Sequence, residues 1–186
     1  MKRRHTVLEI PCSTNFITTT IVNFEPVFHN KPLVDLLIRT INYCCIKYHV
    51  QINGYVIMPN LVHLLASVMS AFTISIFLGQ VKEYSAKQII NWFIINEKNS
   101  YLDLFSSAAA ESKQGHRYQV WQKRFDNAVI TRGKDMIIKL DYIHCNPLRG
   151  RWNLCSKPEE YPFSSAKYYY EGKETGIPIT KISSCE

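Results

Sequence analysis

The alternation of apolar and polar positions predicts three strands in the first half of the chain. Residues 16–22 (FITTTIV) are mostly β-branched or aromatic, which is typical of a strand. Residues 51–58 (QINGYVIM) and 62–68 (VHLLASV) have the same character. Pro59 and Asn60 between them favour a tight turn, so these two strands should pair antiparallel. A shorter strand-like segment surrounds Val120 and Trp121.

Helical periodicity dominates the segments between and after these strands. An apolar stripe from Val34 to Tyr48 follows Pro32, a residue that suits a first helical turn. A second stripe runs over residues 74–92 and a third over 134–146, where Pro147 ends it. The order of elements predicts an α+β fold with a mainly antiparallel sheet and helices on one face.

The length and composition favour a single domain over residues 1–186. The core should span about 14–150 and a C-terminal extension about 151–186, with an aromatic stretch that adds a last helix. Residues 99–118 lose all periodicity around a Ser-Ser-Ala-Ala-Ala run, which predicts a mobile loop. A hydrophobic content of 46% excludes a disordered chain.

Positive charge is concentrated in one part of the sequence. The chain carries a formal net charge of +7, and most of that surplus lies between residues 113 and 151. The basic residues there are Lys113, Arg117, Lys123, Arg124, Arg132, Lys134, Lys139, Arg149 and Arg151. Such a concentration favours a nucleic-acid partner, although a solvated basic face would give the same pattern. Tyr118, Trp121 and Phe125 lie among these charges and would either stack on unpaired bases or join the core.

Neither a membrane span nor a disulfide framework is expected. The uncharged stretch 61–79 divides into a strand-like and a helix-like part and includes His63 and several hydroxyl side chains. The six cysteines form no Cys-x-x-Cys pair, and Cys44 and Cys45 are adjacent. Free thiols are typical of a reducing compartment, so we expect a cytoplasmic protein without a membrane partner.

Few residues stand out chemically on spacing alone. In the helix over 134–146, Tyr142 lies opposite the apolar face, Asn146 follows one turn later, and His144 falls on the apolar side as a core histidine would. In the strand over 62–68, alternation places Leu61, His63 and Leu65 on one face. An exposed tyrosine and a strand histidine are most often structural.

Three sequence blocks, taken together, change this interpretation. The run GYVIMPNLVHLL at 54–65 resembles the strand–turn–strand of the HUH single-tyrosine transposases, in which Met-Pro-Asn precedes His-hydrophobic-His. The run LDYIHCNP at 140–147, preceded by Trp121-Gln122, resembles the Tyr-Ile-His-x-Asn-Pro of the REP-associated tyrosine transposase branch. The run PEEYPFSSA at 158–166 is similar to the C-terminal motif of that branch. The likeness spans about residues 14–170, with the blocks in the family's order.

The resemblance implies a ferredoxin-like core and an enzyme that acts on single-stranded or hairpin DNA during DNA transposition. It implies a divalent metal ion, Mg²⁺ or Mn²⁺, held by the histidines of the HUH strand, with His63 as the second of them and Asn146 as a third ligand. It also implies that Tyr142 is the nucleophile and forms a 5′-phosphotyrosine intermediate. The bound ion would stabilise charge on the scissile phosphate.

One central position departs from the family pattern. Leu61 occupies the place of the first histidine, and a leucine side chain cannot coordinate a metal. We therefore expect an impaired metal site, unless His49 or a water molecule fills the gap. The alternatives are a catalytically inactive DNA-binding or regulatory relic of the same scaffold, or an RNA-binding ferredoxin-like module. The sequence leaves open whether the protein is a monomer or a homodimer.

Overall fold

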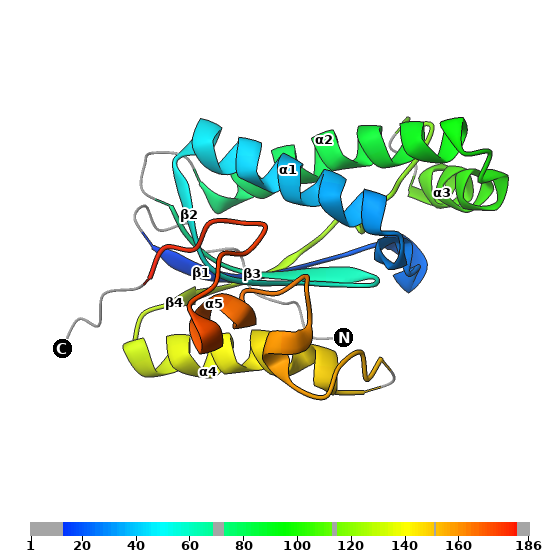
Figure 1. The fold of residues 1–186 in the computed structure, drawn as a ribbon. Coiled ribbons are helices and arrows are strands. Elements are labelled where there is room, and N and C mark those ends of the chain that lie inside the picture. Colours follow the sequence, from blue (N-terminus) through cyan, green and yellow to red (C-terminus); the bar gives the residue numbers. More distant parts are fainter. Residues whose placement is uncertain (1–12, 69–72, 113–114, 151, 182–186) are drawn as a thin grey trace.

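A four-stranded antiparallel sheet forms the centre of the molecule (Figure 1). The computed structural model describes residues 13–68, 73–112, 115–150 and 152–181. The strands are β1 (Thr14–Thr20), β2 (Val50–Met58), β3 (Leu61–Val68) and β4 (Asp126–Ile130), in the spatial order β2-β3-β1-β4. The first three agree with the predicted strands. The fourth lies at 126–130, whereas Trp121 makes only an isolated bridge to Ile21.

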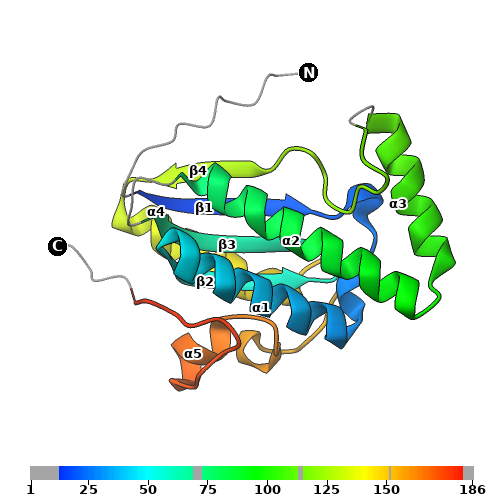
Figure 2. The same cartoon turned by 90° about the horizontal axis from the view of Figure 1, so that it is seen from above.

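Helices cover both faces of this sheet, so the expectation of helices on one face is wrong for part of the fold. Helices α1 (Lys31–Tyr48) and α2 (Ile74–Ile95) lie on one face, and α4 (Gly133–Cys145) lies on the other (Figures 1 and 2). The order β1-α1-β2-β3-α2-β4 is that of a ferredoxin-like core, to which α4 is added. The reason is visible in β3, where Val62 and Leu64 join the core beneath α1 and α2 while Leu65 joins the core beneath α4. A strand buried on both faces has a nearly continuous apolar sequence.

The segment 99–118, expected to be a mobile loop, is largely helical. Helix α3 spans Asn99–Ser112, and Phe105 and Ala109 are buried. The Tyr101 ring stacks on Phe93 of α2 with centroids 4.6 Å apart. Tyr101, Phe105 and Ala109 are spaced four residues apart, so they share one helical face, and alanines stabilise the helix between them. The short side chains in the middle of the segment concealed this stripe.

Gly54 allows α4 to approach the sheet closely. A Cβ atom at this position would lie 2.6 Å from Leu140 Cδ1. The glycine adjoins an irregularity in the pairing of β2 with β3, between Ile52 and Gly54. A glycine within a strand commonly marks such a close approach. The contact sets the height of α4 above the sheet.

The C-terminal part of the chain covers the outer edge of β2. The Ile57 amide donates to the Phe163 carbonyl and the Ser165 amide donates to the Tyr55 carbonyl, both at 2.9 Å. His144 of α4 is buried and its Nε2 lies 2.9 Å from Ser165 Oγ, so its predicted core location is confirmed. These bonds connect α4 to the edge of the sheet and remove an exposed strand edge. The short helix α5 (Ala166–Glu171) follows.

Among the described residues, no helix is both long and apolar enough to cross a membrane. The described cysteines, Cys44, Cys45, Cys145 and Cys155, are free thiols.

Substituting Gly54 by alanine should destabilise the fold. The new methyl group would overlap Leu140, and overpacking of this kind costs about 1–3 kcal/mol. Gly79→Ala in α2 is the matched control, because no atom lies within 4 Å of its added Cβ and alanine favours a helix. Urea denaturation should show a lower midpoint for Gly54→Ala only. Equal midpoints for the two variants would contradict the proposed close contact.

The protein should lose stability in mild acid through His144. Burial lowers the pKa of this imidazole from 6.5 to about 4, although Asp141 opposes the shift. A histidine whose pKa is lowered by folding stabilises the native state above its unfolded pKa, and that contribution is lost as the pH falls from about 6.5 to 4. The melting temperature should therefore decline over this interval, and less steeply for His144→Gln. An unchanged slope in the variant would show that other groups control the decline.

Candidate functional site

Helix α4 brings Tyr142 and Asn146 to the face of the sheet that carries His63. The rings of Tyr142 and His63 meet edge to face with centroids 5.3 Å apart. Asn146 Nδ2 lies 3.3 Å from His63 Nε2. His63 is buried, whereas 39% of the Tyr142 surface is exposed. The structure thus gathers the three residues singled out in the sequence, with the phenol accessible from solvent.

Two residues of β1 complete the surroundings of His63. The Thr18 hydroxyl lies 2.8 Å from His63 Nδ1. The Phe16 ring stacks on the imidazole, with centroids 5.5 Å apart, and meets the Tyr142 ring edge to face at 5.9 Å. Sequence analysis did not identify either residue. The signal is the register of β1 against β3, in which Thr18 is opposite His63, and a sequence pattern does not give that register.

The hydrogen bonds determine the protonation of the His63 ring. An amide nitrogen can only donate, so Nε2 accepts from Asn146 and Nδ1 carries the proton that is donated to Thr18. Burial, aided by the nearby Lys139 ammonium, lowers the pKa of His63 to about 4. The imidazole is therefore neutral at physiological pH. Its Nε2 lone pair points to Asn146.

Lys139 is the cation of α4 that faces this group. Its Nζ lies 4.7 Å from the centroid of the Phe16 ring, a cation–π distance. Lys139 precedes Tyr142 by three positions, so both side chains lie along one side of the helix. The site therefore combines a neutral imidazole, an amide, a phenol and one positive charge.

The other basic residues are distributed more widely than the sequence suggested. Lys123 and Arg124 are exposed before β4, and Arg117 lies over the Tyr118 ring at 5.2 Å. Arg132 pairs with Asp135 at 3.0 Å in the first turn of α4, where Lys134 is also exposed. Arg149 is exposed beyond the short helix η3 (Asn146–Leu148). Lys113 and Arg151 lie outside the described residues. Of these basic residues in the described parts of the chain, Lys139 is the one with a recorded contact to the aromatic group around Tyr142, through Phe16 and His63.

The aromatic residues among these charges pack inward. Trp121 is buried and its indole nitrogen donates to Ser85 Oγ at 3.0 Å. Tyr118 and Phe125 are partly buried against the same core. Of the two alternatives stated above for these rings, the core location is the observed one.

The side chains near Tyr142 do not form a complete site for a divalent ion. Within the described parts of the chain, no group of three His, Cys, Asp or Glu side chains is arranged to hold a metal ion. Leu61 is half-buried and packs into the apolar cluster beneath α4. One imidazole and one amide remain, and neither carries the negative charge of the carboxylates through which proteins usually hold Mg²⁺. The donor set does not fit a resident metal ion.

His49 cannot supply the missing ligand. It precedes Val50, which pairs with Val68 at the far end of β3 from Leu61. Seven residues of strand separate these ends, a distance of about 23 Å at ~3.3 Å per residue. The expectation that His49 might fill the gap is therefore wrong.

Comparison with known proteins identifies the family. The model of the family described as "Transposase IS200 like" matches residues 11–146, so the chain belongs to this family. The structure of a REP-associated tyrosine transposase bound to a REP hairpin is similar, with a TM-score of 0.66 and 19% identity, over 100% of this chain and 98% of that one. A candidate transposase from Deinococcus radiodurans matches with a TM-score of 0.44 and 19% identity, over 77% and 95% of the two chains. A search of curated proteins finds no match.

The family and the shared α+β fold place the chain among the transposases of mobile elements, proteins that carry out DNA transposition. The suspected family and fold class are thereby confirmed. Membership in the family also implies a divalent metal ion. The ligands near Tyr142 in the described parts of this chain do not meet that expectation.

Thr18→Val should release the His63 ring from its fixed tautomer. The substitution removes the acceptor of the Nδ1 proton, and an unsatisfied buried donor costs about 1–3 kcal/mol. Thr20→Val is the matched control, because Thr20 lies on the same face of β1 but opposite Leu61. Nitrogen-15 NMR should show a single His63 tautomer in the wild type and in Thr20→Val, and a mixture in Thr18→Val. A single tautomer in all three proteins would contradict this role of Thr18.

Proposed function

We propose that the protein is a DNA strand transferase in which Tyr142 attacks a phosphodiester of single-stranded or hairpin DNA. The observation that carries this proposal is the exposed Tyr142 phenol beside the His63–Asn146 pair, over the face of the sheet. Membership in the IS200-like transposase family supports it. Because the similar REP-associated transposase is bound to a hairpin, we propose DNA hairpins as the partner here as well.

The proposed step is a transesterification. The phenol oxygen forms a bond to phosphorus and the bond from phosphorus to the 3′ oxygen breaks, giving a 5′-phosphotyrosine and a free 3′-hydroxyl. The phenol releases its proton to solvent and the leaving oxygen takes one up. The number of phosphoester bonds is unchanged, so the 3′-hydroxyl of a strand can later attack the phosphotyrosine without a nucleotide cofactor.

The residues of this chain contribute position and charge to that step. Asn146 and Thr18 hold the neutral His63 ring, which together with Phe16 supports the edge of Tyr142. Lys139 provides positive charge on the same side of α4 for the phosphate. A divalent ion, when bound, would neutralise the phosphate further, but His63 and Asn146 are a reduced ligand set. We therefore expect slow strand transfer with a weak response to Mg²⁺ or Mn²⁺.

Leu61 specifically favours a second candidate function, a DNA-binding protein that has lost strand transfer. An apolar side chain at a metal-ligand position is compatible with a scaffold that still recognises DNA. An RNA-binding role is the weaker third candidate. If the protein binds RNA, unlabelled RNA should displace a labelled single-stranded DNA of the same sequence.

Covalent trapping tests the proposed reaction. The full chain is incubated with labelled hairpin and single-stranded oligonucleotides, with and without Mn²⁺, and analysed on a denaturing gel beside Tyr142→Phe. A slow band that is absent in the variant is expected. Tyr43→Phe, which alters an exposed tyrosine of α1 on the opposite face of the sheet, should leave the band unchanged.

Leu61→His separates the two main candidates. Restoring the imidazole should raise the yield of adduct in Mn²⁺ at least about 10-fold, since loss of even an outer partner of a metal ligand typically costs 10–100-fold. The DNA-binding relic would be supported by three results together. The wild type forms no adduct, it still retains oligonucleotides on a native gel, and Leu61→His restores cleavage. An adduct that persists in Tyr142→Phe would refute the assignment of the nucleophile.

A further inference from the structure

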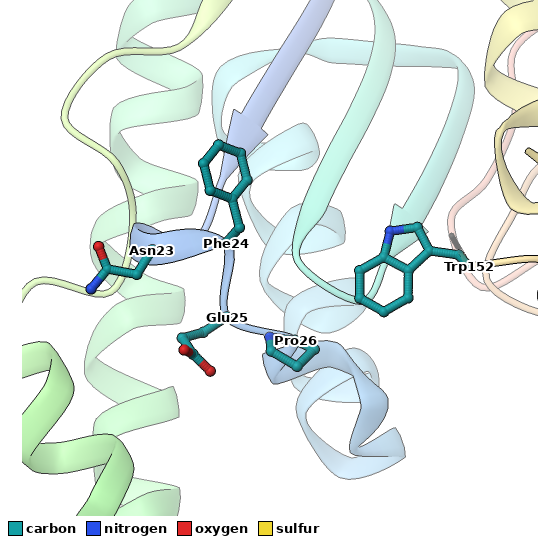
Figure 3. Close-up of a pocket in the computed structure, with 5 residues that line it drawn as sticks. All are labelled: Asn23, Phe24, Glu25, Pro26 and Trp152. Carbon is teal, nitrogen blue, oxygen red and sulfur yellow. The ribbon is translucent and has the colours of Figure 1, made fainter. Parts of the chain in front are cut away.

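A pocket lies next to the turn that joins β2 to β3, outside the Tyr142 site. It is lined by Asn23, Phe24, Glu25, Pro26 and Trp152 and has a volume of about 760 Å³ (Figure 3). That volume falls in the range of small-molecule sites. No residue of this pocket takes part in the proposed strand transfer.

The wall of the pocket is attached to the start of β3. Asn60 Nδ2 donates to the Phe24 carbonyl at 3.2 Å, and the Phe28 amide donates to the Pro59 carbonyl at 2.9 Å. The Ile21 amide donates to the Asn60 carbonyl, also at 2.9 Å. The segment that carries Phe24 therefore encloses the turn from which β3 leads to His63.

Phe24 is displayed at the surface by an unfavourable backbone. Asn23 and Phe24 have φ values of 54° and 57°, a region that is costly for a bulky side chain. The Phe24 ring is 57% exposed, whereas Val22, Val27 and Phe28 on either side of it are buried. An aromatic ring kept out of the core at an energetic cost suggests a ligand.

The chemistry of the lining fits a nucleobase better than a phosphate. Phe24 and Trp152 offer aromatic surfaces on which a base can stack, and the edge of the His29 ring supports the indole at 5.5 Å. Among the described residues that line it there is no cation, whereas Glu25 and Asn23 provide a carboxylate and an amide. A carboxylate accepts from the amino group of a base such as cytosine and repels a phosphate.

The position of the pocket relates it to Tyr142. Trp152 and Leu61 belong to the apolar cluster beneath α4, on the side of the sheet where Tyr142 meets His63. Asn60, which donates to the Phe24 carbonyl, lies three positions before His63, about 10 Å at ~3.3 Å per residue. The loop that carries Trp152 is closed by the Leu154 amide, which donates to the Pro147 carbonyl just after Asn146.

We propose that this pocket binds an unpaired nucleobase, one with an exocyclic amino group, on the strand whose phosphate Tyr142 attacks. The inference rests on the proposed function and extends it, because it gives the protein a site that reads the DNA strand beside the reacting position. Phe24 and Trp152 stack on the base, and Glu25 accepts from its amino group.

Fluorescence anisotropy tests this site without requiring cleavage. All proteins carry Tyr142→Phe and no metal is added. The probes are fluorescein-labelled dC12, dA12 and dT12 and a 12-unit abasic deoxyribose-phosphate strand. The test variants are Phe24→Gly, Trp152→Phe and Glu25→Gln, and Tyr43→Ala is the control, because its ring is 54% exposed on α1, on the opposite face of the sheet from α4.

Phe24→Gly should weaken binding of dC12 and dA12 by roughly 5- to 150-fold, the range expected for one lost stacking contact, and leave the abasic strand unaffected. Its melting temperature should be no lower than that of the parent, since glycine accepts a positive φ. Glu25→Gln should reduce the preference for dC12 and dA12 over dT12, and Tyr43→Ala should change nothing.

Two outcomes would overturn the proposal, and they differ in their meaning. Equal affinity of the parent for base-containing and abasic strands, or unchanged affinity in both Phe24→Gly and Trp152→Phe, would refute the base pocket alone. Failure of every strand to bind, the abasic one included, would refute the proposed action on DNA and the pocket with it.

Discussion

The approach of α4 to the sheet over Gly54 is the contact on which the candidate site depends. Without a side chain at this position, Leu140 packs directly against the backbone of β2, and Tyr142, two residues further along the helix, meets His63. His144, one turn after Leu140 on the same side of the helix, holds it through Ser165. The site is therefore formed by a rigid helix on a rigid sheet, an arrangement that fixes side chains more closely than loops do.

Much of this architecture was predictable from local sequence. The strands of the first half, helices α1, α2 and α4, and the burial of His144 follow from periodicity, and the family follows from three short motifs. Other features needed tertiary information. Helix α3 depends on a sparse stripe of Tyr101, Phe105 and Ala109 that packs near Phe93. The second layer of helices depends on a strand that is buried on both faces. The role of Thr18 depends on the register between β1 and β3. Each of these is a property of pairing, which no single segment encodes.

Leu61 changes the balance of charge at the site. With a histidine at position 61, two imidazoles could hold a metal ion and the positive charge of the site would come from that ion. Here Leu61 joins the apolar cluster beneath α4, and the His63 ring is neutral. Lys139 is the cation that remains close to the aromatic group. An ammonium attracts a phosphate as a point charge but cannot orient it as a coordinated ion does. In the proposed reaction, the residue that attracts the strand and the residue that attacks it are therefore different, Lys139 and Tyr142.

The pairing of residues 163–165 with β2 also imposes an order in time during synthesis. Tyr55 and its partner Ser165 are separated by 110 positions, so β2 is made long before the segment that covers its edge. During that interval the strand edge is open to pairing with other chains. His144 receives its partner in the same late step. The arrangement of Tyr142 over His63 is thus completed only after residue 165 has been added, and a nascent chain that carries the phenol does not yet hold it in place.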